Sequence, residues 1–331
     1  MKKLVSLLLF TFILPVNLAM ATESPKVVVS IKPIHSLVSA VMEGVGTPDL
    51  IIKKGSPHGY TLRPSEAQSL SNADLVIWVG HDLESFLEKP LSTIAKNSQR
   101  LTLTKKIQSA LLAKRTGGDW AKHTHHHDGH DDHDADHDAH EHHDEHNAEH
   151  NHEAHEHHGQ PSMDFHVWLS PTIAKIIVTE TMHKLVQLDP AHAKQYQSNA
   201  AATLKRLERL NTTLADKLAP VKNKPYIVFH AAYQYFENAY NLSAVGSVTI
   251  DPDRKPGAKS ISNIRNKIKR LHAVCVFSEP QFESSLVKTL IEGTNTKTGV
   301  LDPLGANIPA GPDAYFILMN NLADNLLTGL K

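Results

Sequence analysis

The chain has 331 residues, of which 40% are hydrophobic and 21% are charged, and this length accommodates about two domains that each bury a core. It is therefore not a small scaffold held by disulfides. The 34 Lys and Arg residues nearly balance the 35 Asp and Glu residues, which excludes a protein that holds nucleic acid or an anionic membrane by its overall field. The unusual feature of the composition is its 24 His residues.

The first 21 residues have the three parts of a secretory signal peptide. Two lysines follow Met1, residues 4–18 are almost entirely apolar, and Ala19-Met20-Ala21 fits a signal peptidase site, so we expect cleavage after Ala21. A membrane anchor is disfavoured because the apolar run of about 15 residues contains Pro15 and ends at this site. No Cys lies nearby to carry a lipid. The mature chain is predicted to be soluble outside the cytoplasm.

Strands and helices are predicted to alternate through the first part of the mature chain. Short β-branched and apolar runs indicate buried strands, and apolar residues at helical spacing between them indicate helices. This alternation is typical of a mostly parallel sheet covered on both faces. The predicted strands are 26–31, 50–52, 74–79 and 100–103, and the predicted helices are 34–42, 64–71 and 83–95.

Residues 119–159 form an acidic, His-rich insert that interrupts this pattern. It holds 16 His, 13 Asp and Glu and one Lys, so it carries −12 with His neutral, and the rest of the chain carries −1 − (−12) = +11. Such a segment cannot form a packed core, and we expect disorder. Its imidazoles are predicted to form weak sites for Zn, Ni or Cu, although a solvating acidic loop with incidental His remains the alternative. The candidate ligands include His125, His126, His127, His142, His143, His157 and His158.

A long helical segment follows the insert. Ser170 and Pro171 are predicted to begin a helix that ends near Leu188. Residues 189–219 are predicted to form the linking helix, because apolar or small residues recur at helical spacing over the roughly 28 residues from Pro190 to Leu218. Beyond it the alternation resumes, with strands at 226–229, 244–250, 273–277 and 300–301 and helices at 231–240, 260–271, 284–291 and 314–327. The fold class is α/β: two α/β lobes, 22–188 and 220–331, joined by one long backbone helix, with the site in the cleft between the lobes.

Three of the eight His residues outside the insert lie at predicted strand ends or in a glycine-flanked turn, where a ligand between the lobes would lie. These are His58, His166 and His230. Three neutral imidazoles with one further position suit a tetrahedral zinc site. His35 and His81 also follow strands, so the spacing alone does not choose the three. The remaining residues, His183, His192 and His272, are interpreted as surface residues.

Motifs of enzymes are missing from the sequence. It contains neither Gly-x-Ser-x-Gly nor His-Glu-x-x-His, and its glycines do not form a phosphate-binding loop. Glu279 and Glu283 are paired carboxylates in sequence only. The sequence therefore favours a binding protein.

Several runs in one order carry a resemblance to a known family. They are GSPHGYTLRPS at 55–65, FHVWLSP at 165–171, FHAAYQYF at 229–236, FSEPQ at 277–281 and LDPLG at 301–305. Together they resemble the ZnuA family, the periplasmic zinc-binding subunits of high-affinity zinc ABC importers. The resemblance implies that His58, His166 and His230 bind Zn²⁺ in the cleft, and that the protein, a periplasmic monomer, delivers it to the membrane permease. A periplasmic metal chaperone is a further candidate partner.

Two departures from the family pattern affect the site and the second lobe. Pro57 stands where some members have an acidic residue that completes the metal shell. The fourth ligand position on the metal is therefore left to water, to Asp302 or to a His of the insert. The counterpart of Asp302 is a ligand in manganese and zinc relatives. Some members pair the cysteine equivalent to Cys275 with one in the last helix. Cys275 is the only cysteine here, so that bond is absent, and its apolar neighbours favour a buried strand residue.

Two other classes of protein remain open from the sequence. A secreted metal buffer or nickel or copper carrier would use the insert as its main site. A zinc metalloenzyme would keep an open fourth position on the metal, and the sequence offers no general base beside the three His residues.

Overall fold

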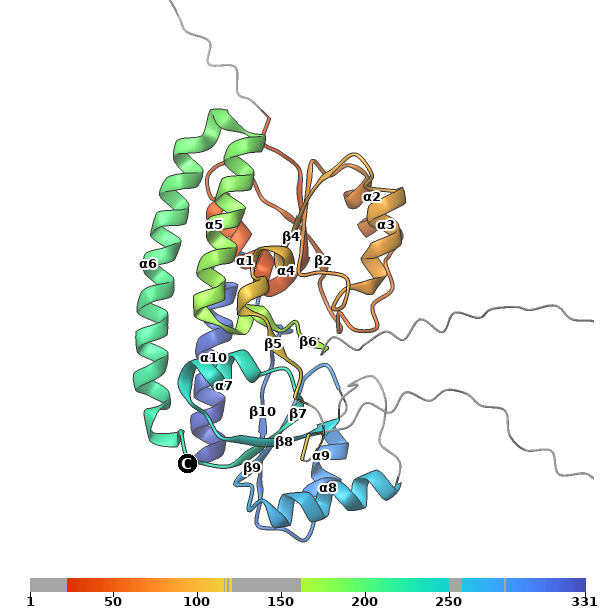
Figure 1. Ribbon diagram of the computed structural model, residues 1–331, viewed down its shortest axis with the longest axis vertical. Coiled ribbons are helices and arrows are strands. Elements are labelled where there is room, and N and C mark those ends of the chain that lie inside the picture. The colour runs from red at the N-terminus through yellow and green to blue at the C-terminus, as the bar shows by residue number, and fades with distance from the viewer. Residues whose placement is uncertain (1–22, 116, 118, 121–161, 250–257, 283) are drawn as a thin grey trace, which may run out of the picture.

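The computed structural model describes residues 23–115, 117, 119–120, 162–249, 258–282 and 284–331 (Figure 1). The predicted signal peptide and the insert's candidate ligands lie outside these residues. Within them, no helix combines the length and the apolar character needed to cross a membrane.

The N-terminal lobe is built on four parallel strands. Their order is β2 (Asp49–Ile52), β1 (Val27–Ile31), β3 (Leu75–Trp78) and β4 (Gln99–Thr102). Every residue of β1 and β3 is buried, as continuous apolar runs in a covered parallel sheet require. The helices of this lobe are α1 (Lys32–Val41), α2 (Pro64–Ser71), α3 (Glu88–Thr93), α4 (Leu103–Lys106) and α5 (Pro171–Leu188), and the 3-10 turns are η1 (Ser85–Leu87) and η2 (Gln108–Ala110).

The C-terminal lobe repeats this design. Its parallel sheet has the order β10 (Lys297–Val300), β9 (Cys275–Ser278), β7 (Tyr226–His230) and β8 (Ala244–Thr249). Its helices are α7 (Gln234–Tyr240), α8 (Ala258–Arg270), α9 (Ser284–Ile291) and α10 (Ala314–Leu330). Cys275 is buried in β9, and burial raises the pKa of its thiol to about 12, which agrees with an inert strand residue.

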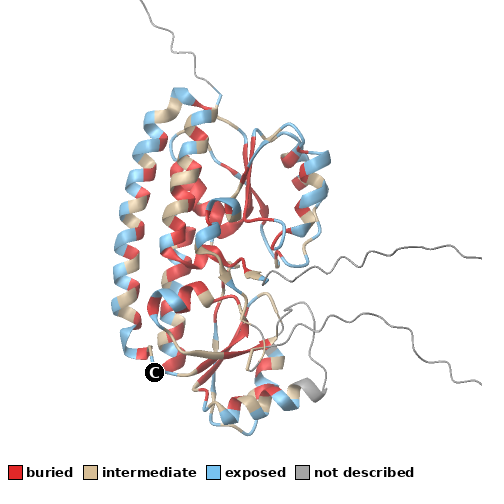
Figure 2. Ribbon diagram, viewed as in Figure 1, coloured by how far each residue is buried: buried red, intermediate tan, exposed pale blue. Residues whose placement is uncertain are grey.

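Helix α6 (Ala193–Leu218) runs alongside both lobes (Figure 1). One face is buried and the opposite face is exposed (Figure 2), and the helix packs against α1, α5 and α10. The 3-10 turns η4 (Pro190–His192) and η5 (Ala219–Val221) flank it, so the regular helix is shorter than the predicted 189–219. Asp189 accepts hydrogen bonds from His192 and Tyr196 and fixes the turn before it. The prediction of two α/β lobes beside one long helix is confirmed.

A two-residue antiparallel pair closes the base of the insert. It consists of β5 (Leu112–Ala113) and β6 (Met163–Asp164), and the turn η3 (Val167–Leu169) follows it. Tyr235 of α7 ties the pair to the C-terminal lobe, because its hydroxyl accepts from Leu112 N at 3.0 Å and donates to Asp164 O at 2.7 Å. The residue two positions after Asp164 is His166, so this pair also positions a candidate ligand.

Further contacts join the lobes through the side chain of Lys32. Its Nζ donates to the carbonyl oxygens of Gly305, Ala306 and Ile308 at 2.6, 3.0 and 2.9 Å. Lys32 begins α1, whereas the three carbonyls belong to the loop after β10. The last helix adds a second connection, because Tyr315 N donates to Ser36 Oγ at 2.8 Å.

A buried carboxyl makes the stability of the N-terminal lobe depend on pH. Glu84 is fully buried, accepts a hydrogen bond from Gly80 N at 2.9 Å, and has a pKa that burial raises from 4.5 to about 7. A raised carboxyl pKa means that the folded state binds the proton more tightly, so stability falls as the pH rises toward and through 7. At high pH, ionisation of the buried Glu84 lowers the free energy of unfolding by about 3 kcal/mol.

We therefore expect Glu84→Gln to raise the melting temperature by a few degrees at pH 8, and by much less at pH 5, where the carboxyl is already protonated. Thermal melts across this range measure the difference. Glu43→Gln, at an exposed position, is the matched control. An equal shift at both pH values would show that ionisation of Glu84 is not the cause.

Candidate metal centre

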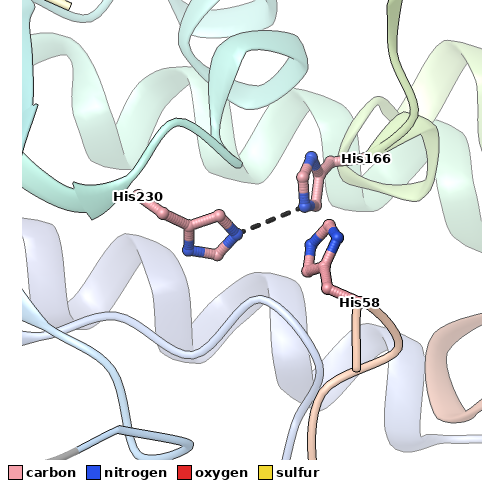
Figure 3. Close-up of side chains that lie close together, drawn as sticks. All are labelled: His58, His166 and His230. Carbon is pink, nitrogen blue, oxygen red and sulfur yellow. Dashed lines mark hydrogen bonds between the residues drawn. The ribbon is translucent and has the colours of Figure 1, made fainter. Parts of the chain in front are cut away.

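Three imidazoles from distant parts of the sequence converge in the structure (Figure 3). One ligand nitrogen of each of His58, His166 and His230 lies within 4.8 Å of the others. The ring centroids are 5.1 to 5.8 Å apart. His58 and His166 come from the N-terminal lobe and His230 from the C-terminal lobe, so the cluster lies between the lobes.

Each of the three residues lies at a strand end or in a loop that faces the other lobe. His230 is the last residue of β7, at the carboxyl edge of a parallel sheet, where ligands of open α/β sheets bind. His58 lies between β2 and α2 in a turn that contains Gly55, whose φ of 100° suits glycine. His166 lies between β6 and η3. Trp168, Phe282, Pro303 and Leu304 provide apolar walls around the cluster.

Two buried carboxylates orient two of the rings. His166 Nδ1 donates to Asp164 Oδ1 at 2.7 Å, and His230 Nδ1 donates to Glu279 Oε1 at 2.7 Å. A carboxylate only accepts, so each neutral ring carries its proton on Nδ1 and its lone pair on Nε2. His166 and His230 are thus presented as metal ligands through Nε2.

The separation of these two nitrogens fits zinc. His166 Nε2 and His230 Nε2 are 3.3 Å apart. Zn–N bonds of about 2.0–2.1 Å at tetrahedral angles place two ligand nitrogens about 3.3–3.4 Å apart. Two lone pairs that face each other repel, and a cation between them removes that repulsion. The geometry is therefore ready for a tetrahedral metal before any movement of the two rings.

The surroundings of His58 and His166 favour the neutral form of these two imidazoles, which is the form that binds metal. Desolvation, followed by repulsion from His166 and His230, lowers the pKa of His58 well below its usual value. Part of His58 nevertheless remains exposed, whereas His166 and His230 are buried. Burial also lowers the pKa of His166, and this effect exceeds the opposing influence of Asp164 and Glu279. Protons therefore compete with a metal at lower pH than for free imidazole.

Asp302, the predicted fourth ligand, has other partners in the structure. Its Oδ1 accepts from Gln281 Nε2 at 2.7 Å and from the backbone of Leu304 and Gly305 at 3.0 and 2.9 Å. Its Oδ2 accepts from Ala306 N at 2.6 Å. Among the described residues, the convergent group contains the three imidazoles and not Asp302. Ligation by Asp302 stays a prediction, and it would require some of these bonds to break.

The other His residues of the described chain do not join the cluster. His35 is buried in α1 and bonds to Pro48 O at 2.9 Å, which is a structural role. His81 faces Glu88 on the surface, and His183 is likewise exposed. His192 belongs to the turn before α6, where Asp189 accepts from its ring, and His272 is exposed. Asp164 and Glu279 contact two of the candidate ligands, and neither was predicted from the sequence as part of the site.

Comparisons with known proteins show which family this chain resembles. The family model described as "ZnuA: Zinc-uptake complex component A periplasmic" matches residues 27–329. The chain is 48% identical over 309 residues to the high-affinity zinc uptake system protein ZnuA of Brucella abortus (strain 2308), covering 93% of this chain and 92% of that protein. It is 37% identical over 321 residues to the protein of the same name from Yersinia pestis, covering 96% and 93%.

Solved structures share the fold at lower identity. A crystal structure of ZnuA matches with a TM-score of 0.72 at 22% identity, covering 93% of this chain and 100% of that one. The periplasmic zinc binding protein TroA from Treponema pallidum matches with a TM-score of 0.72 at 19% identity, covering 93% and 99%. Because the family model spans residues 27–329 and the Brucella protein is 48% identical over 93% of this chain, the chain belongs to the ZnuA family.

Proposed function

We propose that this protein captures Zn²⁺ in the periplasm between its two lobes and delivers it to the permease of a zinc ABC importer. The observation that carries the proposal is the convergence of His58, His166 and His230 within 4.8 Å, two of them oriented by buried carboxylates. Membership of a zinc-uptake family supports zinc as the cargo. The protein is a solute-binding protein and not an enzyme.

The donor set supports zinc over harder divalent cations. Neutral imidazole suits Zn²⁺, whereas Mn²⁺ and Mg²⁺ prefer oxygen ligands. Three protein nitrogens leave the fourth tetrahedral position to water, to Asp302 or to a His of the insert. Asp164 and Glu279 contact Nδ1 of His166 and His230, on the opposite side of each ring from Nε2, so neither is placed as a general base for a water on the metal.

The remaining assignments complete this proposal. Residues 1–21 act as a signal peptide, and the mature protein works as a monomer. Residues 22–188 and 220–331 are its lobes, and 189–219 link them. The insert at 119–159 is an auxiliary module that binds Zn²⁺ weakly through residues such as His125 to His127, His142, His143, His157 and His158. Its partners are the permease and, as a further candidate, a periplasmic metal chaperone.

The first prediction concerns the three imidazoles. We expect His58→Ala, His166→Ala and His230→Ala each to weaken the tightest zinc-binding event by at least ~10-fold, because each removes one of three protein ligands. Competition with a chromophoric chelator measures this affinity. His183→Ala, at an exposed position on α5, is the matched control and keeps wild-type affinity. Unchanged tight binding in two of the three variants would refute the assignment of the cleft.

The second prediction separates the cleft from the insert by pH. Free imidazole has a pKa near ~6.5, so sites in the insert lose zinc between about pH 7 and 5. Because the pKa values of His58 and His166 are lowered, the cleft keeps its zinc to lower pH. Calorimetry at pH 7.5 is expected to show one tight site and several weaker ones, and the weaker ones are lost first on acidification.

Deletion of residues 122–158 tests the same division of roles. The deletion variant is expected to retain the tight site and to lose the weaker class. Loss of the tight site on deletion would instead identify a metal buffer that uses the insert as its main site. Persistence of the weaker class would remove the insert from the proposal.

A further inference from the structure

The charge of the cargo has to be balanced within the protein. Zn²⁺ brings two positive charges, and three neutral imidazoles bring none. Burying an uncompensated charge is costly, so a mostly enclosed divalent cation needs negative charge close by. Asp164 and Glu279 are the carboxylates hydrogen-bonded to the rings of His166 and His230, and each residue is 2% exposed.

These two carboxylates lack a cationic partner of their own. Of the Lys and Arg residues that the structure describes, none forms an ion pair with Asp164 or Glu279. Asp164 Oδ2 and Glu279 Oε2 are buried without a hydrogen bond of normal geometry among the described atoms, and the group that interacts with Glu279 there is the neutral hydroxyl of Tyr233. Glu237, an equally buried carboxylate, has a full ion pair with Arg115 at 2.5 Å. Among the residues that the structure describes, Asp164 and Glu279 are therefore carboxylates without a Lys or Arg counter-charge.

We propose that Asp164 and Glu279 are positioning residues that also make the site selective for a divalent cation, because their two negative charges cancel those of the metal across the two ligand rings. The inference rests on the proposed function, since it requires the three imidazoles to hold the metal. Lys114 near His58 is partly exposed and screened by water, and Asp302 is balanced by Lys32. With both carboxylates present, a divalent cation gives a neutral site, whereas a monovalent cation leaves one buried negative charge uncompensated. When one carboxylate is removed, the monovalent cation gives the neutral site and the divalent cation leaves one positive charge in excess.

The test compares Zn²⁺ with Ag⁺ in the full chain and in the isosteric variants Asp164→Asn and Glu279→Gln. Each protein is loaded with Co²⁺, whose visible absorption band reports a tetrahedral site. Zn²⁺ or Ag⁺ is then added in chloride-free buffer, and the loss of the band measures how well each ion displaces Co²⁺. The same titration of a variant with all three imidazoles replaced by Ala gives the contribution of the insert, which is subtracted. Glu84→Gln, at a buried carboxyl elsewhere in the N-terminal lobe, is the matched control.

Each isosteric variant is expected to bind Zn²⁺ at least ~10-fold more weakly and to lower the ratio of Zn²⁺ to Ag⁺ affinity by a similar factor. Glu84→Gln leaves both affinities unchanged. Parallel losses for both metals would mean that the carboxylates only orient the rings, and an unchanged Zn²⁺ affinity would remove both roles. The proposed function would instead be refuted if the wild-type chain gave no cobalt band, or gave one that persists when all three imidazoles are replaced by Ala.

Discussion

The hydrogen bonds from His166 to Asp164 and from His230 to Glu279 are each 2.7 Å long, and the remaining properties of the site depend on them. They fix the proton of each ring on Nδ1, so that both lone pairs point to the same place at a separation of 3.3 Å. Without them the rings could turn or exchange tautomers, and the cost of ordering them would be subtracted from the binding free energy. The carboxylates thus determine both where the ligand atoms lie and what charge the site accepts.

This arrangement requires the two lobes to keep a fixed position relative to each other, because the two hydrogen-bonded pairs belong to different lobes. Helix α6 packs against α1, α5 and α10, and α10 contributes Tyr315, whose hydroxyl donates to Trp168 O at 2.8 Å. Trp168 Nε1 in turn donates to Pro303 O at 2.7 Å in the loop after β10. Both bonds lie within a few residues of His166. The same contacts that join the lobes therefore also fix the position of His166, a candidate ligand.

Much of the fold was predictable because its signals are local. Each of these signals lies within one element. They include the apolar runs of β1 and β7, the Ser170 cap of α5 and the helical spacing from Tyr196 to Leu218. The helix predicted over 83–95 was wrong in extent. Pro90 has no N–H and is tolerated only in a first turn, so the regular helix begins at Glu88 after the 3-10 turn η1. The pair β5–β6 was not predicted, because two-residue strands leave no periodic pattern.

The site was predictable only in part for a related reason. The three imidazoles were recognised from strand ends and from the family resemblance, whereas spacing alone could not separate them from His35 and His81. Glu279 lies 49 residues from His230, and only the pairing of β7 with β9 brings their ends together. Asp164 lies two residues before His166, so a search for carboxylates beside candidate ligands would have found it.

The same charge balance explains why the carboxylate of Asp302 has a structural role here. Lys32 lies close enough to Asp302 to interact with its charge, and the Lys32 ammonium binds the carbonyls of the loop that the carboxylate caps. Burial lowers the pKa of Lys32, and the negative charge of Asp302 opposes that shift, so Asp302 favours the charged form of the lysine that joins the lobes. With Asp164 and Glu279 each beside a candidate ligand ring, ligation by Asp302 would place three negative charges around the two positive charges of Zn²⁺, and it would break hydrogen bonds that hold the loop carrying Pro303 and Leu304 against the site. This charge balance favours water or a His of the insert over Asp302 as the fourth ligand, and ligation by Asp302 stays a prediction.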